Sequence, residues 1–184
     1  MSILLKEIYL NNFHKENSAK FVNFAGYSMP INYSLGIINE HIHTRKSAGV
    51  FDVSHMGQIL IPMKNNQKII NKYIPIDFDN FKINRSYYSF FLNERGGIID
   101  DIIISKIKYN KDYYYFIVYN SSRKSVNESI FKDNFKDYII INNNSYLAVQ
   151  GPKSVSILKN IFIECTKLNF MNIDVLKYKN FNIF

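Results

Sequence analysis

The chain has 184 residues, which allows one domain or two small ones, and 47% of them are hydrophobic, which suffices to build a core. Its formal net charge is +8, but the lysines are scattered singly, which favours a compositional bias over a nucleic-acid-binding surface. The single cysteine, Cys165, excludes an internal disulfide bond, and no apolar run reaches the ~20 residues that span a membrane. We therefore expect a soluble cytoplasmic protein that binds neither nucleic acid nor a membrane.

The first third of the chain predicts a helix, a strand and a second helix. The helix covers residues 36–48, the strand follows over 51–62, and the second helix covers 65–76 and is ended by Pro75. In the first helix His41 falls on the apolar face beside Ile38, so we expect a hydrogen-bonded core histidine there. His43 stands two positions further on and points to another side, which argues against a metal site built from this pair.

The middle of the chain carries the clearest strand signals. Strands over 87–93, 98–107 and 113–120, joined by a turn at 94–97 and a loop at 108–112, predict a three-stranded antiparallel meander. We expect Ser121 to cap the next helix.

A strand over 145–149 and a helix from Ser154 follow, so the chain belongs to the α+β class. Residues 177–184 are typical of a strand up to the last residue, and from this abrupt end we expect the chain to be truncated.

Two adjacent carboxylates interrupt the apolar strand over 98–107. Side chains alternate along a strand, so Asp100 shares a face with Ile98 and Ile102, and Asp101 shares the other face with Ile99 and Ile103. The two carboxylates therefore cannot form an acid–base dyad that shares a proton. Alternation alone leaves open which of them is functional.

Several blocks of the sequence resemble, in order, the glycine cleavage system T protein, an aminomethyltransferase that uses tetrahydrofolate. The blocks are FAGYSMPINY (24–33), a helix with Glu40, His41 and Arg45, SAGVFDVSHMGQI (47–59), YSFFLNERGGIIDDIIIS (88–105) and LAVQGPKS (147–154). The resemblance implies an antiparallel sheet with flanking helices, in a truncated folate-binding aminomethyltransferase-like fold. It also implies a folate-binding domain over 51–141, a partial second domain from 1–50 and 142–184, and the absence of the carboxy-terminal domain.

The same resemblance selects the site residues. It implies that Asp101 is catalytic and hydrogen-bonds the folate near its reacting nitrogen. Met56 and Leu60 would line the pocket, Tyr88 would pack beside the pterin, and Asn120 would hydrogen-bond the pterin edge.

The implied reaction transfers the methylene of the aminomethyl group, carried on the lipoyl arm of the H protein, to tetrahydrofolate. Ammonia is released, and 5,10-methylenetetrahydrofolate is the product. Because a later Arg-Thr-Gly-Tyr-Thr-Gly-Glu block of the family is not in this sequence, we expect weak or absent turnover.

Two alternatives come from other functional classes. The first is a folate-binding module without aminomethyl transfer, like the related proteins of iron–sulphur assembly and tRNA modification. The second is a basic protein that binds RNA or a membrane surface, whose binding would depend steeply on salt.

Overall fold

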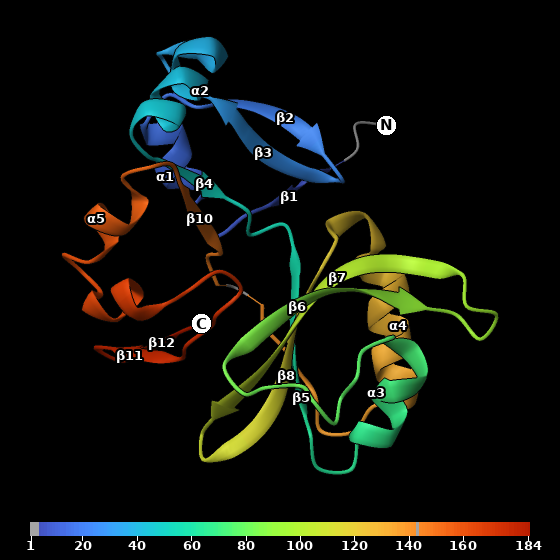
Figure 1. Cartoon of the computed structure of the whole chain (residues 1–184). Helices are drawn as coiled ribbons and strands as arrows, with labels where there is room; N and C mark the ends of the chain where they lie inside the picture. The colour runs from blue at the N-terminus through green and yellow to red at the C-terminus, as the bar shows by residue number, and fades with distance from the viewer. Residues whose placement is uncertain (1–3, 143) are drawn as a thin grey trace. The chain divides into compact units, whose positions relative to one another are not determined.

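The computed structural model describes residues 4–142 and 144–184. These residues divide into two compact units, the first within residues 1–55 and 143–167 and the second within residues 56–142 and 168–184. Figure 1 shows both units as mixtures of strands and short helices, and most of the strand pairs are antiparallel. The predicted α+β class is therefore confirmed.

The second unit, called unit 2 below, is built around a five-stranded antiparallel sheet. The strand order is β6-β7-β8-β5-β9, so the chain-consecutive strands β6, β7 and β8 form the predicted meander. The strands are β5 (Gly57–Pro62), β6 (Arg85–Leu92), β7 (Ile98–Tyr109), β8 (Asp112–Tyr119) and β9 (Ile139–Ile140). The predicted strand over 51–62 is therefore only partly correct, since β5 begins at Gly57 and an earlier strand ends at Asp52.

Two helices of unit 2 cover one face of this sheet, as Figure 1 shows. They are α3 (Gln67–Tyr73) and α4 (Lys124–Asn134), the latter preceded by the 3-10 turn η1 (Ser121–Arg123). Alternate residues of the strands point toward the helices, because side chains of a strand alternate between its faces. The buried core they form contains Ile59, Ile61, Ile102, Ile104, Ile117, Tyr115, Tyr119, Phe91, Ile70, Ile74, Phe131 and Phe135, together with Phe78 and Phe81 from the loop between α3 and β6.

The predicted cap at Ser121 is wrong. Ser121 is the first residue of η1, and α4 begins only at Lys124, with no side-chain hydrogen bond at its amino-terminal cap. Within the described residues, the buried Oγ of Ser121 has no hydrogen-bond partner.

The last seventeen residues also belong to unit 2. They contain the antiparallel hairpin of β11 (Leu176–Tyr178) and β12 (Phe181–Ile183). The Ser86 backbone N–H donates to the Met171 carbonyl at 2.8 Å, and the Phe184 ring stacks on Phe116 with centroids 5.3 Å apart. The domain boundaries expected from the sequence place residues 168–184 in the partial second domain. These contacts instead join the segment to the sheet of unit 2.

The other unit, unit 1, contains two small sheets. The first is β1 (Lys6–Glu7), β3 (Tyr27–Asn32) and β2 (Lys20–Phe24), and the second pairs β4 (Gly49–Asp52) with β10 (Leu147–Gln150). Its helical segments are α1 (Asn11–Glu16), α2 (Gly36–Lys46), α5 (Ser154–Leu158) and the 3-10 segment η2 (Ile163–Lys167).

The prediction that His41 is a core histidine is wrong. His41 is exposed, because α2 buries none of its residues despite the apolar spacing of its isoleucines. The buried histidine is His14, whose ring nitrogens lie 2.6 Å from Tyr33 Oη and 3.0 Å from Asp52 Oδ2.

Candidate functional site

Polar side chains from three neighbouring strands meet at one end of the unit 2 sheet. Asp101 lies on β7, Tyr88 on the edge strand β6, and Asn120 directly follows β8. The Tyr88 hydroxyl donates to Asp101 Oδ2 at 2.7 Å, and the Asn120 side-chain amide donates to Asp101 Oδ1 at 2.9 Å. The structure thus brings together three of the five residues that the sequence selects.

The contact with Asp101 changes the acidity of Tyr88. The hydrogen bond to the carboxylate, with smaller contributions from partial burial and from the charges of both aspartates, raises the pKa of Tyr88 above 10.0. Since the phenol stays protonated at neutral pH, it remains a donor to Asp101. The Tyr88 residue is 60% exposed, so its side chain offers a flat aromatic surface beside the carboxylate.

The other aspartate, Asp100, faces the opposite side of the sheet and is 5% exposed. Its carboxylate accepts from the Asn120 backbone N–H at 3.0 Å, the Asn120 side-chain amide at 2.8 Å and the Asn127 amide at 2.6 Å. A buried charge is costly unless donors surround it, and three donors do so here. The two carboxylates point to opposite faces, as strand alternation predicts, but one asparagine connects them.

A β-bulge lies immediately before this pair. Phe91 pairs with Asp100, whereas Leu92 pairs with Ile98, so Ile99 is an extra residue in β7. Ile99 packs against the helix-side core, and its carbonyl accepts from Arg123 Nε at 2.9 Å. The sequence-based expectation that Ile99 shares a face with Asp101 is therefore wrong, because the bulge interrupts alternation at that residue.

The two apolar residues of the predicted site lie on or beside β5. The pairing of Gly57 with Tyr119 brings half-buried Met56 to the same end of the sheet as Asn120. Leu60 pairs with Phe116 further along and is only 2% exposed. Met56 is thus near the cluster, whereas Leu60 lies deeper in the sheet and offers almost no open surface.

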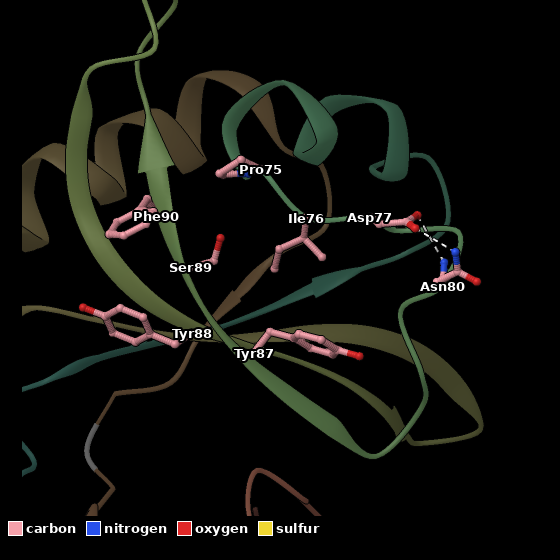
Figure 2. Close-up of a pocket in the computed structure, with 8 residues that line it drawn as sticks. All are labelled: Pro75, Ile76, Asp77, Asn80, Tyr87, Tyr88, Ser89 and Phe90. Carbon is pink, nitrogen blue, oxygen red and sulfur yellow. Dashed lines mark hydrogen bonds between the residues drawn. The ribbon is translucent and has the colours of Figure 1, made fainter.

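A pocket of about 390 Å³ lies along the edge strand β6 and includes Tyr88. Figure 2 shows Tyr88 and Phe90 projecting to one side of the strand and Tyr87 to the other, with Asp77 and Asn80 on the facing loop. Asp101 and Asn120 are not among its lining residues. The hydrogen-bonded cluster, rather than this pocket, therefore defines the candidate site.

Sequence reasoning did not identify Asn127, which is fully buried on α4 and donates to Asp100. Its signal is a polar residue four positions before the buried Phe131, on the helix face that packs against the core. The omission matters because Asn127 donates to the carboxylate of Asp100. The same carboxylate accepts from the side chain of Asn120.

Several kinds of site are not found in the part of the chain that the structure describes. No three histidine, cysteine, aspartate or glutamate side chains lie close enough together there to hold a metal ion. No described helix is long and apolar enough to cross a bilayer.

The chemistry available at the cluster is the acceptance of hydrogen bonds. Asp101 presents a carboxylate, and in residues 4–142 and 144–184 no hydrogen bond to Asn120 Oδ1 is found. Together with the exposed Tyr88 ring, these oxygens suit a flat heteroaromatic ligand with N–H groups along its edge.

A family model and individual known proteins match this chain, and they point to the same family. The model of the GCVT N-terminal domain family matches residues 10–183. A mitochondrial aminomethyltransferase from Dictyostelium discoideum is 35% identical over 180 residues, which cover 91% of this chain and 44% of that protein. An aminomethyltransferase from Chloroherpeton thalassium is 32% identical over 182 residues, covering 96% of this chain and 47% of that protein.

A solved structure agrees with these relatives. The crystal structure of glycine cleavage system aminomethyltransferase T from Bartonella henselae superposes with a TM-score of 0.83 and 32% sequence identity, over 92% of this chain and 47% of that one. The chain therefore spans less than half the length of the relatives it matches. With a family match over nearly the whole chain and a fold that agrees, the chain belongs to the GCVT N-terminal domain family.

Proposed function

We propose that this chain carries the folate-binding site of an aminomethyltransferase of the glycine cleavage system. The reaction transfers a methylene group from the aminomethyl-lipoyl H protein to tetrahydrofolate and releases ammonia. The observation that supports this proposal best is the cluster of Asp101, Tyr88 and Asn120 on three neighbouring strands. The names of the matched relatives agree with it.

The residues of the cluster fit a reduced folate. Its pterin is a flat ring system whose edge carries N–H donors, and Asp101 and Asn120 Oδ1 are acceptors. Tyr88, which is 60% exposed as a residue, offers an aromatic side chain, and Met56 adds half-buried apolar surface. Tetrahydrofolate supplies the nitrogen nucleophile that accepts the methylene group.

Asp101 is the proposed catalytic residue. Both of its oxygens accept from neutral donors, and within the described residues no lysine or arginine forms an ion pair with it. Its negative charge is therefore available to orient an N–H group and to stabilise positive charge that develops at the reacting nitrogen. Tyr88 and Asn120 hold the carboxylate in place for that role.

The H protein is the proposed partner and the cytoplasm the proposed compartment. Neither the partner nor the turnover of this chain follows from the family alone, because the matched relatives are about twice as long. One of those relatives is mitochondrial, so the cytoplasmic location stays a prediction. The alternative of a folate-binding module without aminomethyl transfer is not favoured, since these relatives are named aminomethyltransferases.

The direct test is isothermal titration calorimetry of the purified chain with tetrahydrofolate. The matched control ligand is p-aminobenzoylglutamate, which keeps the tail of the folate molecule and lacks the pterin. We expect saturable heat with tetrahydrofolate and none at the same concentrations with the control, because the cluster recognises the pterin edge. Equal heats from the two ligands, or no binding of tetrahydrofolate, would contradict the proposal.

A further inference from the structure

Asp100, the buried aspartate next to the candidate site, has no direct role in the proposed reaction. Its carboxylate nevertheless binds the side chain of Asn120, which is part of the proposed site. Asp100 Oδ1 accepts from Asn120 Nδ2 at 2.8 Å. The same nitrogen donates to Asp101 Oδ1 at 2.9 Å and lies 3.2 Å from the Asp101 carbonyl. Three oxygen acceptors therefore surround one end of the Asn120 amide.

This arrangement fixes which end of the amide is the nitrogen. An oxygen in the position of Nδ2 would face three other oxygens with no hydrogen between them, whereas NH2 has two protons to donate. With both protons committed to the two aspartates, Asn120 has only Oδ1 left for a ligand. The ligand group that faces Asn120 must then be a donor.

Asp100 is itself held firmly. Its second oxygen, Oδ2, accepts from the Asn120 backbone N–H at 3.0 Å and from Asn127 Nδ2 at 2.6 Å. Asn127 is fully buried and Asp100 is 5% exposed, so neither side chain has room to turn toward solvent. The carboxylate is therefore a fixed reference for the amide of Asn120.

We infer that Asp100 is a positioning residue, which orients the Asn120 amide so that Oδ1 is the acceptor offered to the N–H edge of the ligand. The inference rests on the proposed function for the identity of that ligand. The orientation itself depends only on the hydrogen bonds of Asp100 and Asp101.

The isosteric variant Asp100→Asn separates positioning from folding. A backbone N–H cannot be reversed, so the new amide must place its oxygen toward the Asn120 backbone and Asn127, which keeps two of the three hydrogen bonds. Its NH2 then faces Asn120 Nδ2, a donor against a donor. Turning the Asn120 amide over would relieve this conflict, but it would then place Asn120 Oδ1 against the oxygens of Asp101. Neither orientation of the amide is therefore favoured, and Asn120 loses its single orientation.

The test is a double-mutant cycle on the dissociation constant for tetrahydrofolate, measured on the full chain. We expect Asp100→Asn to weaken binding about tenfold in the wild-type background and less than about twofold in the Asn120→Ala background. A general loss of stability is controlled by Asn66→Ala, which removes a buried hydrogen-bonded amide elsewhere in unit 2 and should leave binding unchanged. An equal effect of Asp100→Asn in both backgrounds, or none in either, would overturn the inference.

A second readout needs no ligand. The NH2 signals of Asn120 in a ¹⁵N NMR spectrum are identified by their disappearance in Asn120→Ala. We expect them to exchange slowly with water in the wild type and rapidly in Asp100→Asn. Rapid exchange in the wild type, or slow exchange in both proteins, overturns the inference. A wild-type chain that shows slow exchange but does not bind tetrahydrofolate would contradict the proposed function alone.

Discussion

At the scale of single residues, the candidate site depends on a phenol that donates to a carboxylate. Tyr88 and Asp101 lie on neighbouring strands, and their hydrogen bond is 2.7 Å long. A carboxylate acceptor stabilises the neutral phenol and repels a phenolate, which is why the pKa of Tyr88 is raised. While Asp101 is ionised, the stabilisation from this pair is present below pH 10.0 and is lost as the pH rises through the raised pKa of Tyr88.

Removing the charge of Asp101 should therefore make Tyr88 more acidic. In Asp101→Asn we expect the pKa of Tyr88 to fall toward 10.0, because the charged acceptor is replaced by a neutral amide. The measurement is an ultraviolet titration of phenolate absorbance, with the titration of the matching protein that also carries Tyr88→Phe subtracted. Asp112→Asn, an exposed change at the start of β8, is the control. Identical Tyr88 midpoints in Asp101→Asn and wild type would show that the pair does not form in solution.

The site could be predicted from the sequence only in part. The family resemblance selected Asp101, Tyr88 and Asn120, which the structure brings together, and Met56, which lies near them. The structural importance of Asp100 was not predicted, because strand alternation shows only that it faces away from Asp101. Its donors come from residues twenty and twenty-seven positions later, and no local pattern links them.

At the scale of elements, the junction of β5 and β8 leaves no room for a side chain at Gly57. A Cβ atom there would lie 2.0 Å from Tyr119 Cε2, and the Tyr119 ring is fully buried against Phe131. The ring therefore has no open direction in which to move. Gly57 pairs with Tyr119 in this register, which brings Met56 to the same end of the sheet as Asn120.

The variant Gly57→Ala should destabilise unit 2 by about 3 kcal/mol, because the added methyl overlaps a buried ring. Urea unfolding followed by circular dichroism measures the change. The control is Gly96→Ala, where no atom lies within 4 Å of the new Cβ and only the positive φ of 76° opposes the change. We expect Gly96→Ala to lower the free energy of unfolding by about 1 kcal/mol. A cost for Gly57→Ala no larger than the control would contradict the packing described for this junction.

Elements were predicted best where periodicity and burial agree. The meander of β6, β7 and β8 follows the alternating and apolar runs of its sequence closely. The helix over 36–48 was also found, as α2, but its apolar spacing did not indicate burial, since Ile37 and Ile38 are 58% and 74% exposed. Periodicity reports the geometry of a segment, whereas burial depends on what packs against it.

At the scale of the whole molecule, the two units differ in how much apolar surface they bury. Among the described residues, the buried apolar side chains of unit 1 are Ile8 and Met29, and the rest belong to unit 2. Unit 1 relies instead on polar contacts such as that between His14 and Asp52. Because apolar burial is the main stabilising term in folding, unit 2 should be the more stable unit.

Hydrogen exchange followed by mass spectrometry tests this difference. We expect peptides from β7 and β8 to exchange at least about tenfold more slowly than peptides from β2 and β3 in the same molecule. Equal or faster exchange of the unit 2 strands would contradict the assignment of the main core to that unit.

The central claim, that Asp101 belongs to a site for reduced folate, is tested most directly by calorimetric titration of three proteins with tetrahydrofolate. They are the wild type, Asp101→Asn, and Asp112→Asn, which removes the same charge from the start of β8. We predict equal dissociation constants for the wild type and Asp112→Asn, and binding weaker by about tenfold to a hundredfold in Asp101→Asn, as expected for a lost hydrogen bond to a charged group. Equal binding by Asp101→Asn and the wild type would contradict the claim.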